Sequence, residues 1–306
     1  MKDYDELKSY LQFLYQSNAD SEGHNNYFKK EQIESHLINQ VGEPVPMDLV
    51  YMYQDYLATS LIYQFGNTFF QQNQTRAHVL DVGSRFETAL SFSHIANVTY
   101  LEPRDVNFPL EKEESSSKRI ILKHIPAFSL VRGEAQAIPA ENESYDYGVS
   151  LHAMEHFGLG RYGDTIDYYG DQKGLKEFHR VLKKDGKLIL SIPCGFNTII
   201  RFNKERIYNP SVVDEMLDNC GFNLEESFVI CPHTLWDDEG NNAGFGPVYC
   251  TPSILERFRE QYEKNNSFAS PNAAYVVCAS KKWIMKNIKQ ILDNLEKQDD
   301  KTVINM

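Results

Sequence analysis

The sequence predicts an α/β protein with a doubly wound, mostly parallel sheet and a helical N-terminal part. Three observations indicate this class. Short apolar runs typical of buried strands begin at His78, segments with apolar residues at helical spacing lie between several of them, and residues 1 to about 76 show the helical spacing alone. Because alternating strands and helices form parallel sheets, we expect helices on both faces of this sheet.

Six runs are the expected strands of the sheet. They are residues 78–84, 97–102, 145–152, 187–193, 226–231 and 273–280. Helical patterns fill residues 174–186 and 210–222. Each run is short and rich in branched or aromatic residues, as expected for strands that are buried on both faces.

The flanking segments have a different character. Residues 1–76 are expected to form a helical cap or an oligomerisation element, with a break at Pro44 and Pro46 because proline disfavours helix. Residues 77–281 then form the ligand-binding domain. Residues 282–306 begin with an amphipathic pattern and end polar, so we expect a C-terminal helix and a tail.

Composition excludes several functions. The chain has 43 acidic and 31 basic residues, so its net charge of −12 disfavours general binding to nucleic acid or to anionic membranes. No apolar run has the length that a membrane helix needs, and no signal-peptide pattern opens the chain. Five scattered cysteines without a C-x-x-C pair suggest reduced thiols. We therefore expect a cytoplasmic location.

Two acidic residues lie at the ends of neighbouring strands. Asp81 and Gly83 end the first run, and Glu102 ends the next, about twenty residues later. In doubly wound sheets, ligands bind at the carboxyl ends of strands, and an acid in the position of Glu102 accepts hydrogen bonds from ribose hydroxyls. The pair therefore indicates an adenosine-containing ligand. The alternative is a turn glycine beside a surface acid.

The loop after the first strand is poor in glycine. The sequence DVGSRFET has one glycine where a dinucleotide site has G-x-G-x-x-G, and no P-loop pattern is present. Without a phosphate cradle, an adenosine ligand that lacks phosphate is favoured. S-adenosylmethionine fits that description.

Four ordered motifs then carry a family resemblance. They are VLDVGS, YLEP, GEAQAIPAENESYDYGVSLHAMEHFGLG and GLKEFHRVLKKDGKLILSIP, within residues 78–194. This stretch resembles class I S-adenosylmethionine-dependent methyltransferases of the Methyltransf_11-like kind. HAMEHFGLGRYGD and FNKERIYNPSVVDEML are similar to bacterial DUF268-type proteins, which are often associated with surface-polysaccharide genes. The resemblance implies a Rossmann-like methyltransferase sheet whose last strand is antiparallel.

The resemblance also implies residue roles. Asp81, Gly83 and Ser84 would line the methionine portion of the cofactor, and Glu102 would hold its ribose. The adenine ring would lie beside Glu134, Ala135 and Gln136, while Ser150, Leu151 and His152 would lie under the sulfonium. The first motif departs from the family pattern because Arg85 and Glu87, or their neighbours, replace the later glycines.

Three interpretations remain open for His152, Glu155 and His156, which follow the fourth expected strand. In the first interpretation they are acid–base or substrate-orienting groups, since histidine is suited to proton transfer near neutral pH. Alternatively, two imidazoles and a carboxylate hold a divalent metal ion, or Glu155 and His156 cap and orient the loop. Arg161 is grouped with these three as a candidate catalytic residue, and no metal ligand is assigned.

The loop over residues 158–171 is rich in glycine, tyrosine and aspartate. Arg161 is suited to bind a phosphate or carboxylate, and Tyr162, Tyr168 and Tyr169 to stack on a sugar or base. The alternative is a structural loop whose aromatic residues pack on one another. Arg201 and Arg206 likewise suit a nucleotide diphosphate, or are exposed solubilising charges.

These observations favour an enzyme that methylates a small polar acceptor. The expected acceptor is a hydroxyl of a sugar or nucleotide sugar in surface polysaccharide biosynthesis, and a homodimer is a further expectation. Two alternatives remain. The acceptor is a phosphorylated or amino-bearing metabolite, or the chain is a non-catalytic, methyltransferase-like binding module.

Overall fold

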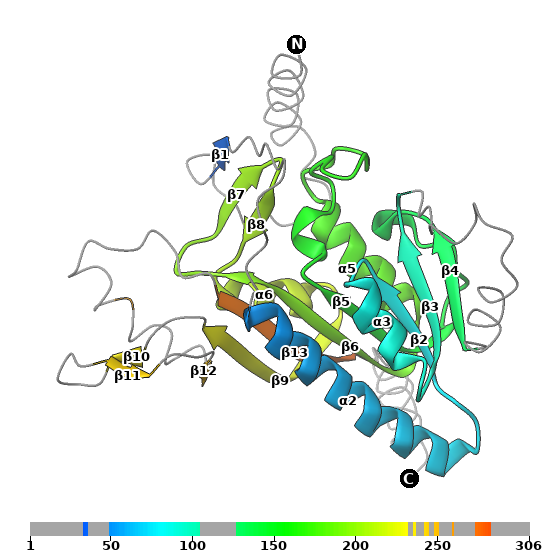
Figure 1. Cartoon of the computed structure of the whole chain (residues 1–306). Coiled ribbons are helices and arrows are strands. Elements are labelled where there is room, and N and C mark those ends of the chain that lie inside the picture. Colours follow the sequence, from blue (N-terminus) through cyan, green and yellow to red (C-terminus); the bar gives the residue numbers. More distant parts are fainter. Residues whose placement is uncertain are drawn as a thin grey trace, which may run out of the picture.

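A computed structural model describes residues 33–35, 49–104, 127–231, 235–236, 242–244, 248–250, 259 and 273–282. Its centre is an eight-stranded sheet with helices on both faces (Figure 1). The predicted cap over residues 1–76 is described only at residues 33–35 and from residue 49 onward. The predicted C-terminal helix and tail lie outside the described residues, apart from Lys282.

The sheet has the order β12-β9-β13-β6-β5-β2-β3-β4. Strands β4, β3, β2, β5 and β6 are parallel, whereas β13 is antiparallel to both β6 and β9, and β12 is antiparallel to β9. The prediction of a mostly parallel, doubly wound sheet with an antiparallel last strand is therefore confirmed. The strands are β2 (His78–Val82), β3 (Asn97–Glu102), β4 (Phe128–Arg132), β5 (Tyr145–Leu151), β6 (Leu182–Cys194), β9 (Phe222–Cys231), β12 (Val248–Cys250) and β13 (Ala273–Lys281).

The order of the strands reverses beside β2. From β2 the chain passes to β3 and then β4 on one side, and it returns to form β5 on the other side. In doubly wound sheets this reversal opens a crevice at the carboxyl ends of the strands. The crevice is therefore expected beside Val82 and Leu151, the last residues of β2 and β5.

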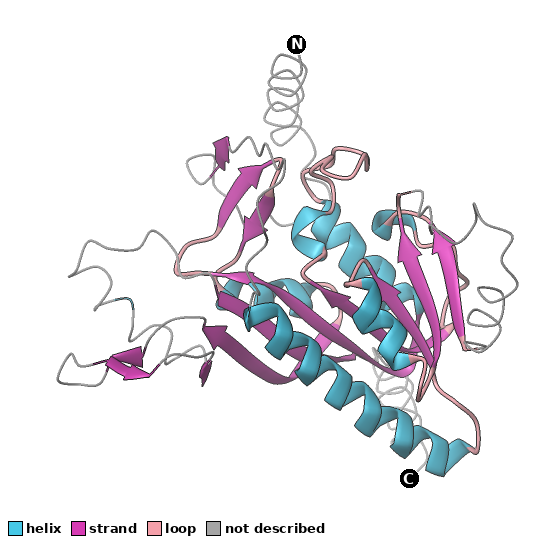
Figure 2. Ribbon diagram, in the orientation of Figure 1, coloured by secondary structure: helices cyan, strands magenta, loops and turns pink. Residues whose placement is uncertain are grey.

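The remaining elements are short, except for the long helix α2 (Leu49–Asn73) (Figure 2). The other helices are α3 (Phe86–Phe92), α5 (Gly170–Val181) and α6 (Pro210–Asn219), with 3-10 turns η2 (Ala135–Ala137) and η3 (Met154–His156). A second sheet contains β1 (Ile33–Ser35), β7 (Ile199–Phe202) and β8 (Glu205–Ile207), and β10 (Leu235–Trp236) pairs with β11 (Asn242–Gly244). The strand β1 lies where the sequence pattern predicted helix.

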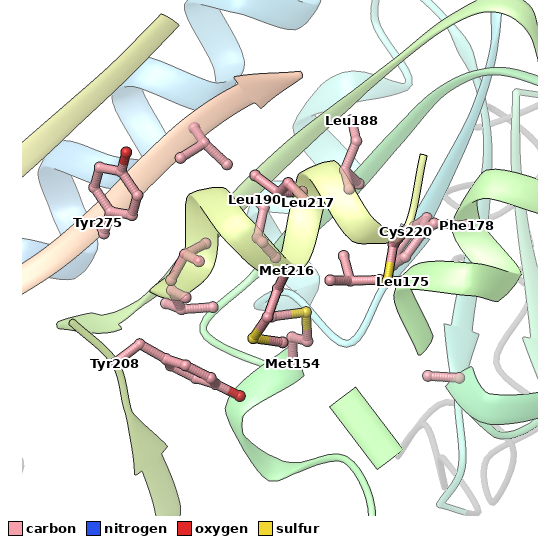
Figure 3. Close-up of a cluster of buried hydrophobic side chains, with 14 of the residues drawn as sticks. Met154, Leu175, Phe178, Leu188, Leu190, Tyr208, Met216, Leu217, Cys220 and Tyr275 are labelled. Atoms are coloured by element: carbon pink, nitrogen blue, oxygen red, sulfur yellow. The ribbon is translucent and has the colours of Figure 1, made fainter. Parts of the chain in front are cut away.

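The helices bury a different core on each face of the central sheet. On one face, Ile62 of α2 and Phe92 of α3 pack against strand residues such as Val149. On the other face, α5 and α6 pack on β6, and Figure 3 shows Phe178 and Met216 in this core. Because a Cβ at residue 148 would lie 2.9 Å from Cδ1 of Phe178, glycine at that position lets α5 approach the sheet closely.

Helix α2 is part of the main body of the protein. Its buried residues Val50, Ala58 and Ile62 cover β9, β13 and β5. This contact fits the helical spacing seen in the sequence, whereas the boundaries predicted at residues 76 and 281 remain predictions. None of the helices in the described ranges is long and apolar enough to cross a membrane.

Candidate functional site

A pocket opens at the carboxyl ends of β2, β3 and β5, where the order of the strands reverses. It encloses about 550 Å³, including its open mouth. Seven of the predicted site residues line it: Gly83, Glu102, Glu134, Ala135, Gln136, His152 and His156. The sequence motifs thus come together at the place where doubly wound sheets bind ligands.

The turn after β2 requires glycine for two reasons. Gly83 has φ +72°, which a residue with a side chain rarely adopts, and a Cβ there would lie 2.9 Å from Cβ of Ala153. Its backbone N–H donates to the carbonyl of Leu101 at 3.2 Å. The turn is thereby held against β3, and its backbone forms part of the pocket wall.

Asp81 lies beneath this turn and is fully buried. One carboxyl oxygen accepts from the backbone N–H of Ser84 at 3.1 Å, and Oδ2 has no hydrogen-bond partner among the described residues. Burial raises the pKa of Asp81 to about 7, and the nearby Asp55 adds to the shift. Asp81 does not belong to the pocket lining, so its unpartnered oxygen lies behind the turn that carries Gly83.

Ser84, Ser150 and Leu151 lie behind the pocket lining. Oγ of Ser84 accepts from the backbone N–H of Leu151 at 3.1 Å, and Oγ of Ser150 donates to the carbonyl of Val82 at 3.0 Å. All three are buried, and the lining residues do not include them. These bonds tie the end of β2 to the end of β5, while a direct cofactor contact of the three residues stays a prediction.

Glu102 is bound by a residue that the sequence analysis did not select. The guanidinium of Arg104 donates to both carboxylate oxygens, at 2.6 and 2.9 Å, and lies 4.5 Å from the centre of the Tyr162 ring. Glu102 is 3% exposed. The sequence did contain a signal for this contact, because Arg104 follows the strand-end acid Glu102 by two residues. Arg104 and Tyr162 connect the end of β3 to the loop after β5 on one side of the pocket.

Glu134, Ala135 and Gln136 form a second part of the pocket wall. Glu134 precedes η2, and Ala135 and Gln136 lie within it. The turn is held by α5, because the backbone N–H of Ile138 donates to Glu177 at 2.8 Å. Their contact with an adenine ring remains a prediction.

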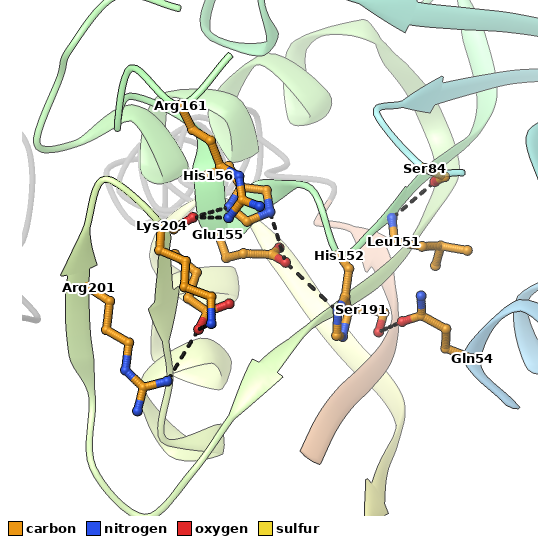
Figure 4. A network of polar contacts seen from close by, with 11 residues as sticks. Gln54, Ser84, Leu151, His152, Glu155, His156, Arg161, Ser191, Arg201 and Lys204 are labelled. Carbon is orange, nitrogen blue, oxygen red and sulfur yellow. Dashed lines mark hydrogen bonds and ion pairs between the residues drawn. The ribbon is translucent and has the colours of Figure 1, made fainter. Parts of the chain in front are cut away.

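His152, Glu155 and His156 come together at the opposite wall (Figure 4). Oε1 of Glu155 lies 3.6 Å from Nε2 of His156 and 3.9 Å from Nδ1 of His152. Burial raises the pKa of Glu155 well above its ordinary value. Within the described part of the chain, no group of three histidine, cysteine or acidic side chains is placed to hold a metal ion.

His152 is held in an unusual conformation. Its φ is +49°, and such backbone strain in a residue other than glycine is concentrated at functional sites. The ring packs edge-on against Tyr51 of α2, with 4.6 Å between the ring centres. Burial, together with the charge of Arg85, lowers the pKa of His152 to about 3. The imidazole is therefore uncharged at neutral pH.

His156 is held by a backbone carbonyl. Its Nδ1 lies 2.6 Å from the carbonyl oxygen of Lys204, which only accepts hydrogen bonds, so Nδ1 carries the proton. Burial lowers the pKa of His156 to about 3, and Arg161 adds to the effect. Arg161 itself donates to the same carbonyl at 2.8 Å and lies outside the pocket lining.

In the loop over residues 158–171, two of the three tyrosines pack on each other and the third lines the pocket. Tyr168 and Tyr169 are buried and pack on each other, with 4.8 Å between their ring centres. Stacking on a sugar by these two residues is therefore a wrong interpretation, because they form the core of the loop. Tyr162 is 37% exposed and lines the pocket.

The prediction that Arg206 binds a nucleotide diphosphate is wrong, and so is its exposed alternative. Arg206 is fully buried and donates to the carbonyls of Phe157 and Tyr168, at 2.6 and 2.9 Å. Its Nε lies 3.6 Å from Oδ2 of Asp171. The guanidinium is an internal strut that holds the loop after η3 against α5. Arg201 pairs with Glu205 at 3.3 Å.

The family comparison agrees with part of the sequence resemblance. Residues 125–230 match the family described as "Caenorhabditis protein of unknown function, DUF268", over about a third of the chain. The match includes β5, the residues around His152, and α5. No curated protein matches the sequence.

Solved structures with similar folds include three proteins described as methyltransferases. A candidate sarcosine dimethylglycine methyltransferase from Galdieria sulphuraria has 14% identity, with 75% of this chain and 84% of that chain covered, at a TM-score of 0.47. A candidate methyltransferase from Bacillus halodurans has 18% identity, 72% and 100% coverage and a TM-score of 0.45. The third is the 1,6-didemethyltoxoflavin-N1-methyltransferase of Burkholderia thailandensis, with bound 1,6-didemethyltoxoflavin and S-adenosylhomocysteine. It has 14% identity, with 82% of this chain and 100% of that chain covered, at a TM-score of 0.42.

Proposed function

We propose that the protein is an S-adenosylmethionine-dependent methyltransferase that acts on a small polar acceptor. One observation carries this proposal. The pocket at the switch point combines the Gly83 turn with the strand-end acid Glu102 and has no glycine-rich phosphate cradle, while Asp81 lies buried behind the turn. A nucleoside that carries no phosphate suits this set of groups.

The pocket residues fit such a cofactor. The backbone at Gly83 leaves room where a Cβ would collide. Asp81 lies behind this turn and holds it by accepting from the backbone N–H of Ser84. Glu102 has the acceptor oxygens that a ribose diol needs, although Arg104 now uses them. A bound ribose must therefore share Glu102 with Arg104 or displace it.

When bound, S-adenosylmethionine supplies an electrophilic methyl group on a positively charged sulfur. The contribution of this chain is to position the acceptor beside that group and to take the acceptor's proton. His152 and His156 line the pocket and are uncharged, so each ring has a nitrogen lone pair. Because the pKa of each ring is lowered to about 3, such a nitrogen is a weak base that takes the acceptor's proton only as the methyl group is transferred.

For the acceptor we propose a hydroxyl of a sugar or nucleotide sugar, as in surface polysaccharide biosynthesis. The net charge of −12 disfavours a nucleic-acid acceptor. The exposed ring of Tyr162 at the pocket is a surface on which a sugar ring can stack. The sugar itself is inferred by analogy with DUF268-type proteins.

The test is methyl transfer from radiolabelled cofactor to a panel of nucleotide sugars, free sugars, phosphorylated metabolites and amines. We expect label in a nucleotide sugar or sugar, and greatly reduced transfer by Glu102→Ala. The matched control is Glu225→Ala, which removes an exposed acid whose partner is Lys187, outside the pocket. Transfer only to acceptors of the other classes would contradict the sugar assignment, and no transfer at all would contradict the enzyme.

A phosphorylated acceptor remains the second candidate because Arg104 lines the pocket and Arg161 lies next to Tyr162. Replacing Arg161 with methionine should weaken a phosphate-bearing acceptor strongly and a neutral one little. The same replacement of Arg206 is uninformative, since that residue is buried in the loop core.

A further inference from the structure

The site contains a chain of polar groups that starts at a backbone carbonyl. The carbonyl of Lys204 is followed by His156, then Glu155, then His152 (Figure 4). The carbonyl contact is a hydrogen bond, whereas the two contacts of Glu155, at 3.6 and 3.9 Å, are longer than one. Such contacts at catalytic sites often shorten only when the reactants are bound.

The carbonyl of Lys204 fixes the proton of His156, and the burial of Glu155 then sets the direction of the next proton. Nδ1 of His156 must donate to Lys204, so in the neutral ring Nε2 is an acceptor, and Nε2 faces Glu155. Glu155 is 1% exposed, and burial favours its uncharged acid form. The acid O–H therefore donates toward Nε2 of His156.

The same direction continues to His152. Oε1 of Glu155 keeps a lone pair that faces Nδ1 of His152 at 3.9 Å, so an N–H at Nδ1 suits this contact when it shortens. In the neutral ring Nε2 of His152 then carries no proton. That nitrogen is buried, has no hydrogen-bond partner within the described part of the chain, and belongs to a side chain that lines the pocket.

We propose that Nε2 of His152 is the base of the reaction and that Glu155 and His156 are positioning residues that set its tautomer. The assignment rests on the proposed function. The acceptor's O–H or N–H bond breaks, its proton forms a new bond to Nε2, and its electron pair stays on the acceptor atom that receives the methyl group. His156 is excluded as the base because both of its nitrogens face protein groups.

Helix α2 completes the arrangement. Tyr51 holds one side of the His152 ring, and the guanidinium of Arg85 lies 5.4 Å from the Tyr51 ring and is paired with Asp55. On the same helix, Oε1 of Gln54 accepts from Ser191 at 2.5 Å, and the carbonyl of Ser191 accepts from the backbone N–H of His152 at 2.8 Å. The imidazole is thus fixed by its ring and by its backbone.

The test is ¹⁵N NMR of the full chain labelled at histidine, near neutral pH, without ligand. The two rings are assigned through His152→Asn and His156→Asn. We expect both rings to be neutral with the proton on Nδ1. Glu155→Gln, whose amide both donates and accepts, should keep this state, whereas Glu155→Leu should release His152 to the Nε2-protonated form. A wild-type His152 ring protonated at Nε2 would overturn the assignment.

A chemical probe keeps the inference falsifiable if Glu155→Leu does not fold. Diethylpyrocarbonate reacts with unprotonated imidazole nitrogens that no other group occupies. In the wild-type chain it should therefore modify His152, whose Nε2 has no partner among the described residues, in preference to His156, whose Nε2 faces Glu155. Saturating S-adenosylhomocysteine should slow the reaction at His152. Preferential modification of His156 would overturn the assignment of the base. Absence of S-adenosylhomocysteine binding in the same samples would instead overturn the proposed function.

Discussion

The guanidinium of Arg104 holds both carboxylate oxygens of Glu102, the residue expected to bind ribose. Arg104 is about half exposed whereas Glu102 is buried, and with solvent screening of the guanidinium the pair contributes about 1 kcal/mol. A ribose that competes for Glu102 must overcome this contribution. Arg104 therefore occupies the acceptor oxygens that a ribose would use.

Removing this competitor should strengthen cofactor binding. We expect Arg104→Met to bind S-adenosylhomocysteine about two- to fivefold more tightly, the factor that corresponds to up to about 1 kcal/mol. The measurement is titration calorimetry, with the exposed Lys184→Met as the matched loss of positive charge. Weaker binding by Arg104→Met would show that Arg104 contacts the ligand rather than competing with it.

The role of Gly83 can be tested by comparison with Gly163, a second glycine whose φ is also positive. Gly83 and Gly163 both have positive φ, but only Gly83 leaves no room for a Cβ. Each alanine variant should lose about 1 kcal/mol of stability from backbone strain. Gly83→Ala should in addition lose S-adenosylhomocysteine binding, and Gly163→Ala should keep it. Equal binding by the two variants would contradict the role of the turn.

Asp81 should make the protein less stable as the pH rises. Its pKa is raised to about 7 in the folded state, from 3.8, so the folded state binds more protons between these values. The penalty grows as the pH rises through this window and is complete above about pH 7, where it amounts to at most about 4 kcal/mol. Asp81→Asn removes it.

We therefore expect Asp81→Asn to stabilise the protein more at about pH 8 than at about pH 5.5 in urea unfolding. The lowered pKa values of His152 and His156 produce the opposite slope in both proteins, so the comparison cancels their effect. The variant should also bind S-adenosylhomocysteine more weakly. A difference in stability that does not change with pH would contradict the burial of an ionisable Asp81.

Arg206 should stabilise the folded protein and should not contact a ligand. Arg206→Met leaves the Asp171 carboxylate buried without its cation and frees two loop carbonyls, which should cost about 3–5 kcal/mol. Arg201→Met, which breaks a partly exposed pair, should cost less than about 1 kcal/mol. Thermal unfolding of the two variants measures the difference. Similar melting temperatures for the two variants would contradict the structural role of Arg206.

Local pattern was enough to predict the main strands. The segment Asn97–Glu102 was predicted with the bounds that the structure has, because its apolar residues Val98, Tyr100 and Leu101 are buried and two of them are of types that favour strands. The edge strand Phe128–Arg132 was missed, since its residues are half-buried or exposed and its run is not continuous. The short helix α3 has too few turns to show a period.

The site was predictable only where it follows from strand ends. Asp81, Glu102 and His152 end or follow buried strands, so the topology alone brings them to one edge of the sheet. Tyr51 reaches His152 from a helix about a hundred residues earlier in the chain, and no periodicity indicates that contact. Likewise, the burial of Arg206 depends on carbonyls of a distant loop.

The central claim is that the pocket beside Asp81 and Glu102 binds a phosphate-free nucleoside carrying sulfur. Titration calorimetry of the purified full chain with S-adenosylhomocysteine, and separately with NAD, tests it most directly. We predict binding of S-adenosylhomocysteine in the micromolar range, weakened strongly by Glu102→Ala, and no binding of NAD. Binding of NAD, or no heat with S-adenosylhomocysteine, would contradict the claim.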